Sequence, residues 1–298
     1  MSIDWGRRIW LLPIVPVVIL LIAVLARETL HTPAVASFIA TYPGTTALPA
    51  DAPVGLPAWL NWQHFLNIMF MAFIARTAMR IRSKQRPPHF FTRTNSGLIR
   101  TAGAPRRMSI DVWLHLVFDA LWALNGVIFI VLLFVTGQWM RVVPTSWEVF
   151  PNAVSAGLQY LAFQWPIDNA WVNYNSLQVL AYFVTVFVAA PLAILTGLRL
   201  SNAWPQRERW IRSVPERPVR WLHNATLAYF IVFVIVHVFL VVSTGLLRNL
   251  NMMFAANDTD NWFGLILCVL ALDLIMAVWM LLRPPVVAAI AKRFGKVQ

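Results

Sequence analysis

Four of the six histidines in this chain fall within or beside long apolar segments: His64, His115, His223 and His237. Ionisable side chains at membrane depth are costly, and they mark functional sites where they occur. His223 and His237 are 14 residues apart on one segment. That spacing is about four helical turns, so both imidazoles project from nearly the same helix face, about 21 Å apart along the axis. The spacing predicts two sites stacked across one bilayer.

The composition is typical of a polytopic membrane protein. Of the 298 residues, 59% are hydrophobic and only 12% are charged, whereas globular domains carry about 25% charged residues. Six apolar segments are each long enough to cross the hydrocarbon core as a helix. They span residues 9–26, 57–79, 112–136, 177–198, 222–246 and 262–282. The predicted fold class is an all-α polytopic membrane helical bundle with six transmembrane helices.

The basic residues alternate between the two sides of the membrane. Of the 24 Lys and Arg residues, 21 fall in the connections on one side, and Arg27, Arg141 and Arg248 fall on the other. The positive-inside rule therefore places both termini in the cytoplasm. Because the net charge of +12 resides in these connections, it does not indicate nucleic-acid binding.

Two segments are open to more than one interpretation. Arg7 and Arg8 precede the first apolar segment and Ala26 ends it, as in a signal peptide. We expect an uncleaved membrane anchor, and the remaining topology is the same in either case. Residues 146–165 are moderately apolar. We interpret them as an interfacial helix on the outer face, with a plain loop as the alternative.

The topology gives each of the four histidines a depth. The second segment runs from outside to inside, with His64 near its outer start. The fifth runs from inside to outside, with His223 at its inner end and His237 in its outer half. The third runs the same way, with His115 near its inner start. Depth matching pairs His64 with His237 on the outer side, and His115 with His223 on the inner side.

Paired histidines at membrane depth favour haem. Two neutral imidazoles on opposite faces of a haem leave no open axial position, which favours electron transfer over oxygen chemistry. A zinc site would require more protein ligands than two histidines. Cys268 is the only cysteine, which excludes a covalent haem motif and a cysteine-ligated iron–sulfur cluster. The pattern predicts two haem b groups ligated by the four histidines. The alternative is four unrelated histidines with hydrogen bonds inside a bundle; His31 and His89, in the connections, have no assigned role.

Several charged residues near the histidines are candidates for supporting roles. Haem propionates are anionic, so Arg76, Arg80 and Arg199 on the inner side and Arg248 on the outer side are candidate partners. Snorkelling to the interface is the alternative for each arginine. Asp119 lies one turn after His115, where it is a candidate to orient that ligand or to take a proton at a quinone site. A hydrogen-bonded core carboxyl is the alternative.

Two further patterns have no functional assignment. Asp273 lies in the middle of the sixth segment, where an unpaired carboxylate would be expensive, so we expect it to be protonated or hydrogen-bonded. Thr-Gly pairs recur near the ends of three segments, at 136–137, 196–197 and 244–245. A glycine at the helix C-terminus is a sufficient explanation for them.

The chain resembles the dihaem b-type cytochrome subunits of bacterial formate dehydrogenases, nickel-iron hydrogenases and thiosulfate reductases. In that family a four-helix core carries two histidines at this spacing on its last helix. The resemblance covers about residues 62–249 and rests on NWQHFLNIMFMAF, WLHLVFDALWALNGVIF, LAYFVTVFVAAPLAILTGLRL and WLHNATLAYFIVFVIVHVFLVVSTG. VPTSW, NYNSLQVLAY and LTGL look most like the branch that pairs with molybdopterin oxidoreductases. The chain departs from the family by an added span at each end and by a core that enters the membrane from outside.

The resemblance implies a division into three parts. Residues 1–56 are an N-terminal anchor and outer loop, 57–250 a four-helix dihaem core, and 251–298 a C-terminal transmembrane helix with a cytoplasmic tail. The implied protein resides in the bacterial cytoplasmic (inner) membrane and transfers electrons between membrane quinone or quinol and a molybdopterin oxidoreductase subunit. The alternatives are a proton-coupled transporter, a haem-free membrane anchor and a self-sufficient transmembrane reductase. A transporter without haem would be colourless. The transporter hypothesis also does not explain the 14-residue spacing of His223 and His237.

Overall fold

The computed structural model describes residues 13–83, 86–95, 105–165, 169–201 and 214–298, which are mostly helical. Arg7 and Arg8, expected to precede a membrane anchor, lie outside these residues. The chain divides into two compact units: unit 1 is Met1–Val54 with Leu133–Val188, and unit 2 is Gly55–Leu132 with Ala189–Gln298. Residues 251–298, expected as a separate part, belong to the same compact unit as the four histidines.

Four of the described helices are long and apolar enough to cross a membrane. They are α5 (Ile110–Val135), the helix formed by α7 (Ser176–Phe183) and α8 (Ala190–Leu200), α10 (Glu216–Ser243) and α12 (Phe263–Leu281). They coincide with the third to sixth predicted segments. A π-helical turn, Val184–Ala189, joins α7 to α8. The chain is therefore a helical membrane protein.

The first two predicted segments form helices of a different kind. The first segment becomes α2 (Ile14–Leu30), which meets α3 (Pro33–Thr41) at a bend of 81°, so the pair is either one broken span or a re-entrant loop. The second becomes α4 (Ala58–Arg82), which has the length of a span but is less apolar than the other four. Six spans remain a prediction.

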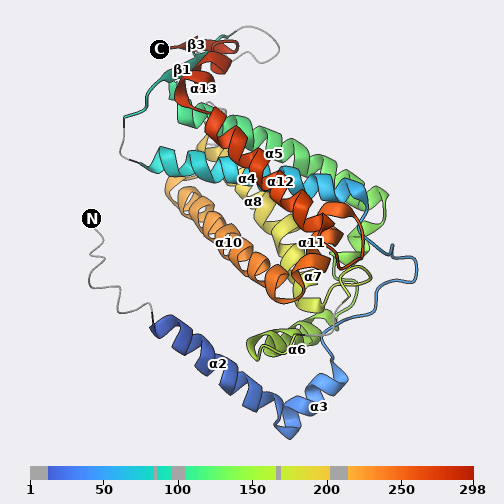
Figure 1. Ribbon diagram of the computed structural model, residues 1–298. Coiled ribbons are helices and arrows are strands. Elements are labelled where there is room, and N and C mark those ends of the chain that lie inside the picture. The colour runs from blue at the N-terminus through green and yellow to red at the C-terminus, as the bar shows by residue number, and fades with distance from the viewer. Residues whose placement is uncertain (1–12, 84–85, 96–104, 166–168, 202–213) are drawn as a thin grey trace. The chain divides into compact units, whose positions relative to one another are not determined.

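Aromatic side chains form the core of unit 2, in which α11 (Leu246–Ala255) packs against α12 and α4, and α10 packs against α8 (Figure 1). Phe73 on α4 is fully buried and stacks on Phe118 of α5, with ring centroids 4.7 Å apart. Phe73 also contacts Trp279 of α12. Burying a phenylalanine contributes about 1.5–3 kcal/mol, so this cluster stabilises α4 and α5, which carry His64 and His115.

A small antiparallel sheet closes one end of unit 2. Its strand order is β2 (Met108–Ser109), β1 (Phe90–Arg93), β3 (Gly295–Val297). Phe91 of β1 is buried in the aromatic core together with Val287 of α13 (Pro284–Ala291). Through the pairing of β3 with β1, the last described residues contact the connection between α4 and α5.

Unit 1 contains the segment interpreted as an interfacial helix. Residues 149–161 form α6 (Val149–Leu161), which packs against α2 and α7 and confirms a helix rather than a plain loop. Small residues such as Ala153 and Ala156 are buried, whereas Phe150 and Val154 are about half exposed. Asn152 fixes the neighbouring loop because its Oδ1 accepts a hydrogen bond from the Gly44 amide at 2.9 Å.

The three Thr-Gly pairs prove to be of two kinds. Gly137 and Gly245 follow helices with φ angles of +73° and +128°, a region in which glycine is favoured, and this confirms their role as helix-ending residues. Gly197 does not end a helix, because α8 continues to Leu200. Its role lies in packing against a histidine, as described below.

Candidate functional site

One unbroken helix, α10, carries both His223 and His237. Neither a proline nor a kink interrupts the 14 residues between them, so the helical rise separates the two imidazoles by about 21 Å. Aromatic rings at intervals of four residues occupy the outer half of this face. Tyr229 stacks on Phe233, and Phe233 stacks on His237 at 5.7 Å and 8° between planes. This stacking restricts the orientation of the His237 ring.

The structure brings His64 of α4 and His237 of α10 together, the same two residues that depth matching pairs. Their ring centroids are 6.4 Å apart, and the planes are inclined by 59°. Phe254 of α11 packs its ring against His64, edge to face, at 5.8 Å. The Nδ1 atom of His64 is buried and has no hydrogen-bond partner among the described residues. An unpaired buried polar atom costs about 1–3 kcal/mol.

The separation of this outer pair suits a single metal ion between the rings. Imidazoles that ligate one ion from opposite sides, each through a bond of about 2 Å, have ring centroids roughly 6 Å apart. The observed 6.4 Å matches that value. The described residues contain no group of three or more His, Cys, Asp or Glu side chains that would hold a metal ion. A two-histidine site therefore fits haem iron, whose other ligands come from the macrocycle, better than zinc.

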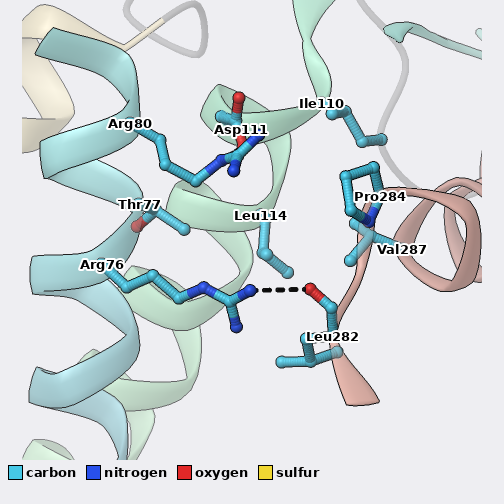
Figure 2. Close-up of a pocket in the computed structure, with 9 residues that line it drawn as sticks. All are labelled: Arg76, Thr77, Arg80, Ile110, Asp111, Leu114, Leu282, Pro284 and Val287. Carbon is cyan, nitrogen blue, oxygen red and sulfur yellow. Dashed lines mark hydrogen bonds and ion pairs between the residues drawn. The ribbon is translucent and has the colours of Figure 1, made fainter. Parts of the chain in front are cut away.

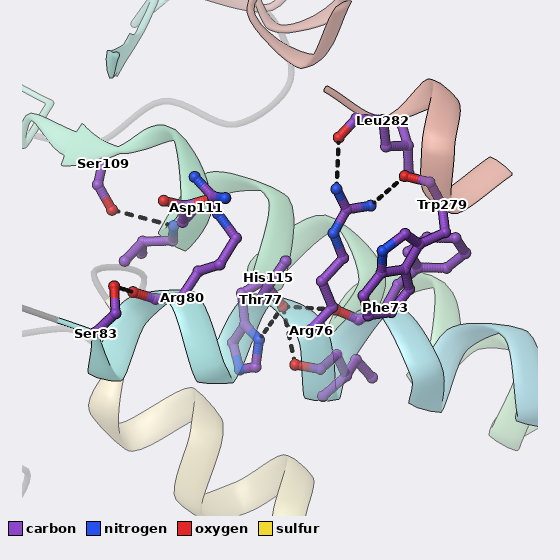
Figure 3. Close-up of polar contacts among 12 residues, drawn as sticks. Phe73, Arg76, Thr77, Arg80, Ser83, Ser109, Asp111, His115, Trp279 and Leu282 are labelled. Carbon is purple, nitrogen blue, oxygen red and sulfur yellow. Dashed lines mark hydrogen bonds and ion pairs between the residues drawn. The ribbon is translucent and has the colours of Figure 1, made fainter. Parts of the chain in front are cut away.

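The inner histidines share one hydrogen-bonding arrangement. Nδ1 of His115 lies 2.8 Å from the hydroxyl of Thr77 on α4 (Figure 3). Nδ1 of His223 lies 2.9 Å from the hydroxyl of Thr196 on α8. Both threonines also bond the carbonyl four residues earlier in their own helix, Thr77 at 2.8 Å and Thr196 at 2.6 Å. A threonine on one helix thus holds a histidine on the next at both positions.

This network assigns the imidazole proton to Nδ1 in both inner histidines. Each threonine hydroxyl donates its single proton to a backbone carbonyl, so it can only accept a hydrogen bond from the histidine. The donor is therefore Nδ1–H of the imidazole. Nε2 is then unprotonated in both rings, as a metal ligand requires.

Glycine at position 197 makes room for the His223 ring. A Cβ at Gly197 would lie 3.5 Å from Cε1 of His223, in ordinary van der Waals contact. A side chain at position 197 would therefore begin directly beside the His223 imidazole. The helix-end explanation expected for this Thr-Gly pair is wrong, because both of its residues contact His223 from within α8.

Asp119 lies within the inner group of ionisable residues. Its Oδ2 atom is 3.6 Å from Nε2 of His115, one helical turn away on α5. His223 is close enough to interact electrostatically with both Asp119 and His115. Asp119 and Thr77 therefore lie at opposite nitrogens of the His115 ring, and the two roles expected of Asp119 stay predictions.

Two of the four arginines expected near haem propionates lie at the end of α4. Arg76 donates to the carbonyls of Trp279 at 2.8 Å and Leu282 at 3.0 Å, which are at the C-terminal end of α12 (Figure 3). Arg80 forms an ion pair with Asp111 at 2.6 Å. The cavity beside them has a volume of about 20 Å³ (Figure 2). That volume holds a water molecule and no quinone ring.

The other two arginines also have protein partners. Arg199 is buried and donates through two nitrogens to the carbonyl of Val214. Arg248 donates to both carboxylate oxygens of Asp258, at 2.6 and 2.9 Å. All four guanidinium groups thus have hydrogen-bond or ion-pair partners within the protein. Their assignment to haem propionates stays a prediction.

Thr77 and Thr196 are the residues that sequence reasoning missed. Thr77 is fully buried, and Thr196 is 5% exposed. A threonine in an apolar helix is unremarkable as a sequence feature, and its partner histidine lies on another helix. The signal available was the depth of each threonine, because Thr77 and Thr196 fall near the inner ends of the second and fourth segments.

Comparisons with protein-family models, with curated proteins and with solved structures found no match to this chain. A functional conclusion therefore rests on the geometry of the two histidine pairs.

Proposed function

We propose that this chain is an integral membrane dihaem b-type cytochrome that transfers single electrons between membrane quinone or quinol and a partner oxidoreductase subunit. One observation supports the proposal: the rings of His64 and His237 lie 6.4 Å apart, and the helix that carries His237 also carries His223. Neither a channel nor a packing role explains two pairs at levels about 21 Å apart.

The protein's own residues hold and orient the two groups. His64 and His237 would ligate one haem iron, and His115 and His223 the other. When bound, each haem would supply reversible one-electron oxidation and reduction. Thr77 and Thr196 keep Nε2 of the inner histidines unprotonated. Phe233 and Phe254 pack against the outer histidines.

Protons accompany the electrons at a quinol site. Oxidation of a quinol releases two protons, and a carboxylate beside the inner pair is suited to accept one. Asp119, 3.6 Å from Nε2 of His115, is the residue in that position. In this proposal Asp119 takes a proton from quinol and passes it toward the cytoplasmic side, where the loop charges place the inner ends of α4 and α5.

The remaining parts of the proposal are supported by the sequence. They are six spans, both termini in the cytoplasm, a bacterial inner membrane, and a molybdopterin oxidoreductase subunit as the partner. The family resemblance supports the partner, and the charge of the connections supports the topology.

A proton-coupled transporter is the second candidate, and one observation favours it. Asp119, His115 and His223 form a group of ionisable side chains within spanning helices, as in proton relays. A transporter built on this group has no need for the outer pair of His64 and His237. Haem content therefore separates the two candidates.

The experiment is a reduced-minus-oxidised absorption spectrum of the purified protein, followed by anaerobic addition of a soluble quinol. We expect b-type haem bands in the first step and reduction of haem by quinol in the second. A folded protein, expressed with haem in excess, that shows no haem band would contradict the cytochrome and leave the transporter. Haem without reduction by quinol would contradict the quinol as electron donor.

A further inference from the structure

Asp273 presents a carboxyl group to the outside of unit 2 at the middle of a spanning helix. It is the eleventh of the 19 residues of α12, and its side chain is exposed. Among the residues that the structure describes, none forms a hydrogen bond or ion pair with it. A lone carboxyl group that faces lipid at this depth costs several kcal/mol.

Four of the exposed residues around Asp273 lie with it in one stripe along α12. Ile266, Val269, Met276 and Met280 are 53, 48, 53 and 58% exposed. With Asp273 they follow each other at alternating steps of three and four residues, the spacing of a helix–helix seam. We call Ile266, Val269, Asp273, Met276 and Met280 the α12 seam. Its spacing fits a partner helix along the whole length of α12.

Contacts at both ends of α12 fix its rotation about its own axis, so Asp273 cannot turn toward the interior of unit 2. At the start, a Cβ on Gly264 would collide with the backbone of Asn251, and the Gly264 amide donates to Oδ1 of Asn251 at 2.9 Å. At the other end, Arg76 donates hydrogen bonds to the carbonyls of Trp279 and Leu282. The outward orientation of the α12 seam is therefore a fixed property of the fold.

The described residues supply no cation for this carboxyl. In the described parts of the other spanning helices, no Lys, Arg or His is exposed near mid-span. Any second copy enters the membrane with the same topology, so its Asp273 lies at the same depth. A protonated carboxyl is a donor as well as an acceptor, and two carboxyls in contact share one proton. The group is therefore complementary to itself.

We propose that α12 pairs in parallel with α12 of a second copy along the α12 seam, with the two Asp273 carboxyls hydrogen-bonded to each other at its centre. The interface is isologous, the commonest arrangement in protein dimers. The four apolar seam residues supply packing, and Asp273 supplies the polar contact that fixes the register, as a single polar residue does in a coiled coil.

Cysteine cross-linking in membranes tests this pairing. In a Cys268→Ala background, Val269→Cys and Met276→Cys place a thiol on the α12 seam, whereas Leu274→Cys is the matched control. Leu274 is 52% exposed but lies on a different side of the helix. After mild oxidation we expect a disulfide-linked dimer for the two seam cysteines and little for Leu274→Cys.

Replacement of Asp273 tests the polar contact. In the Met276→Cys protein, Asp273→Leu should reduce dimer formation about tenfold at low protein-to-lipid ratio, since a hydrogen bond between spanning helices contributes about that factor. Asp273→Asn should retain the dimer because an amide also both donates and accepts. Helical content by circular dichroism checks that each variant folds.

Three results would overturn the proposal: equal cross-linking at Leu274 and the seam positions, no dimer at any position, or a link from Met276→Cys to a different polypeptide. The test is independent of haem, because a His237→Ala protein should cross-link as the parent does.

Discussion

The imidazoles of His64 on α4 and His237 on α10 lie 6.4 Å apart from centroid to centroid, although they come from distant parts of the chain. That distance is close to the span of one metal ion with a nitrogen ligand on either side. The nitrogen Nδ1 of His64 is buried and has no hydrogen-bond partner among the residues that the structure describes.

The threonine hydroxyls should control the inner haem. Thr77→Val and Thr196→Val remove the acceptor for Nδ1–H of His115 and His223 while they preserve side-chain volume. We expect about tenfold weaker retention of one haem and a raised midpoint potential for it, because loss of the hydrogen bond makes the imidazole less basic. Redox titration of the purified variants measures both effects.

The conservative variants Thr77→Ser and Thr196→Ser keep the hydroxyl and should behave as the parent. An equal change at both haems, or no change in potential at either, would show that the hydroxyls have only a packing role.

Side-chain size at position 197 should decide whether the inner pair forms. Gly197→Ala adds a Cβ at 3.5 Å from the His223 ring, which is ordinary contact. Gly197→Leu adds atoms in the volume of the imidazole and should displace it. We expect two haems per chain for Gly197→Ala and one for Gly197→Leu, by haemochrome assay. Two haems in Gly197→Leu would mean that His223 does not need this space.

Arg76 should contribute to stability through α12. Its two bonds to the carbonyls of Trp279 and Leu282 are charge-assisted, and hydrogen bonds of charged groups contribute about 1.5–3 kcal/mol. Arg76→Met should lower the free energy of unfolding by that amount. Arg80→Met, which removes a partly exposed ion pair with Asp111, should cost less than about 1 kcal/mol.

Haem content separates this structural role of Arg76 from the propionate role predicted from the sequence. Unfolding curves in detergent measure the stability, and haem content is measured on the same samples. A large loss of haem in Arg76→Met without a loss of stability would favour the propionate contact.

Because of the Arg248–Asp258 ion pair, the stability of the folded protein should change with pH in the acid range. The Arg248 guanidinium, hydrogen-bonded to both carboxylate oxygens, holds the pKa of Asp258 below its usual range of about 4. A carboxyl with a lowered pKa stabilises the folded state fully above its unfolded pKa, and this contribution is lost as the pH falls through the folded pKa. Asp258→Asn should therefore lower Tm at neutral pH, and this effect should shrink as the pH falls through the lowered pKa of Asp258.

Thermal unfolding of the parent and of Asp258→Asn across this pH range is the measurement. In an Arg248→Met background the effect of Asp258→Asn should vanish at every pH. A difference between parent and Asp258→Asn that does not change with pH would rule out the ion pair as its cause.

The long apolar helices follow from the sequence because each is an uninterrupted run with membrane length. Residues 112–136 and 262–282 predict α5 and α12 to within a few residues. The depth argument then selects His64 as the neighbour of His237, because partners in a bundle of spanning helices must share a level. The bend between α2 and α3 is not apparent from hydropathy, although Pro33 marks its position.

Contacts between short or distant segments could not be predicted in this way. Strand β3 contains three residues and pairs with β1, which lies about 200 positions earlier in the chain. No periodic pattern marks a strand of that length. The bonds of Thr77 and Thr196 to the histidines depend on the rotation of two helices about their own axes, and the apolar pattern restricts that rotation only coarsely.

The haem content of single histidine variants tests the central claim most directly. Pyridine haemochrome assays on the purified parent and on His64→Ala, His115→Ala, His223→Ala and His237→Ala give the number of haems per chain, with His31→Ala and His89→Ala as controls. The account predicts two b haems in the parent and controls, loss of the same haem in His64→Ala and His237→Ala, and loss of the other in His115→Ala and His223→Ala. A parent protein without haem, or variants that keep both haems, would contradict it.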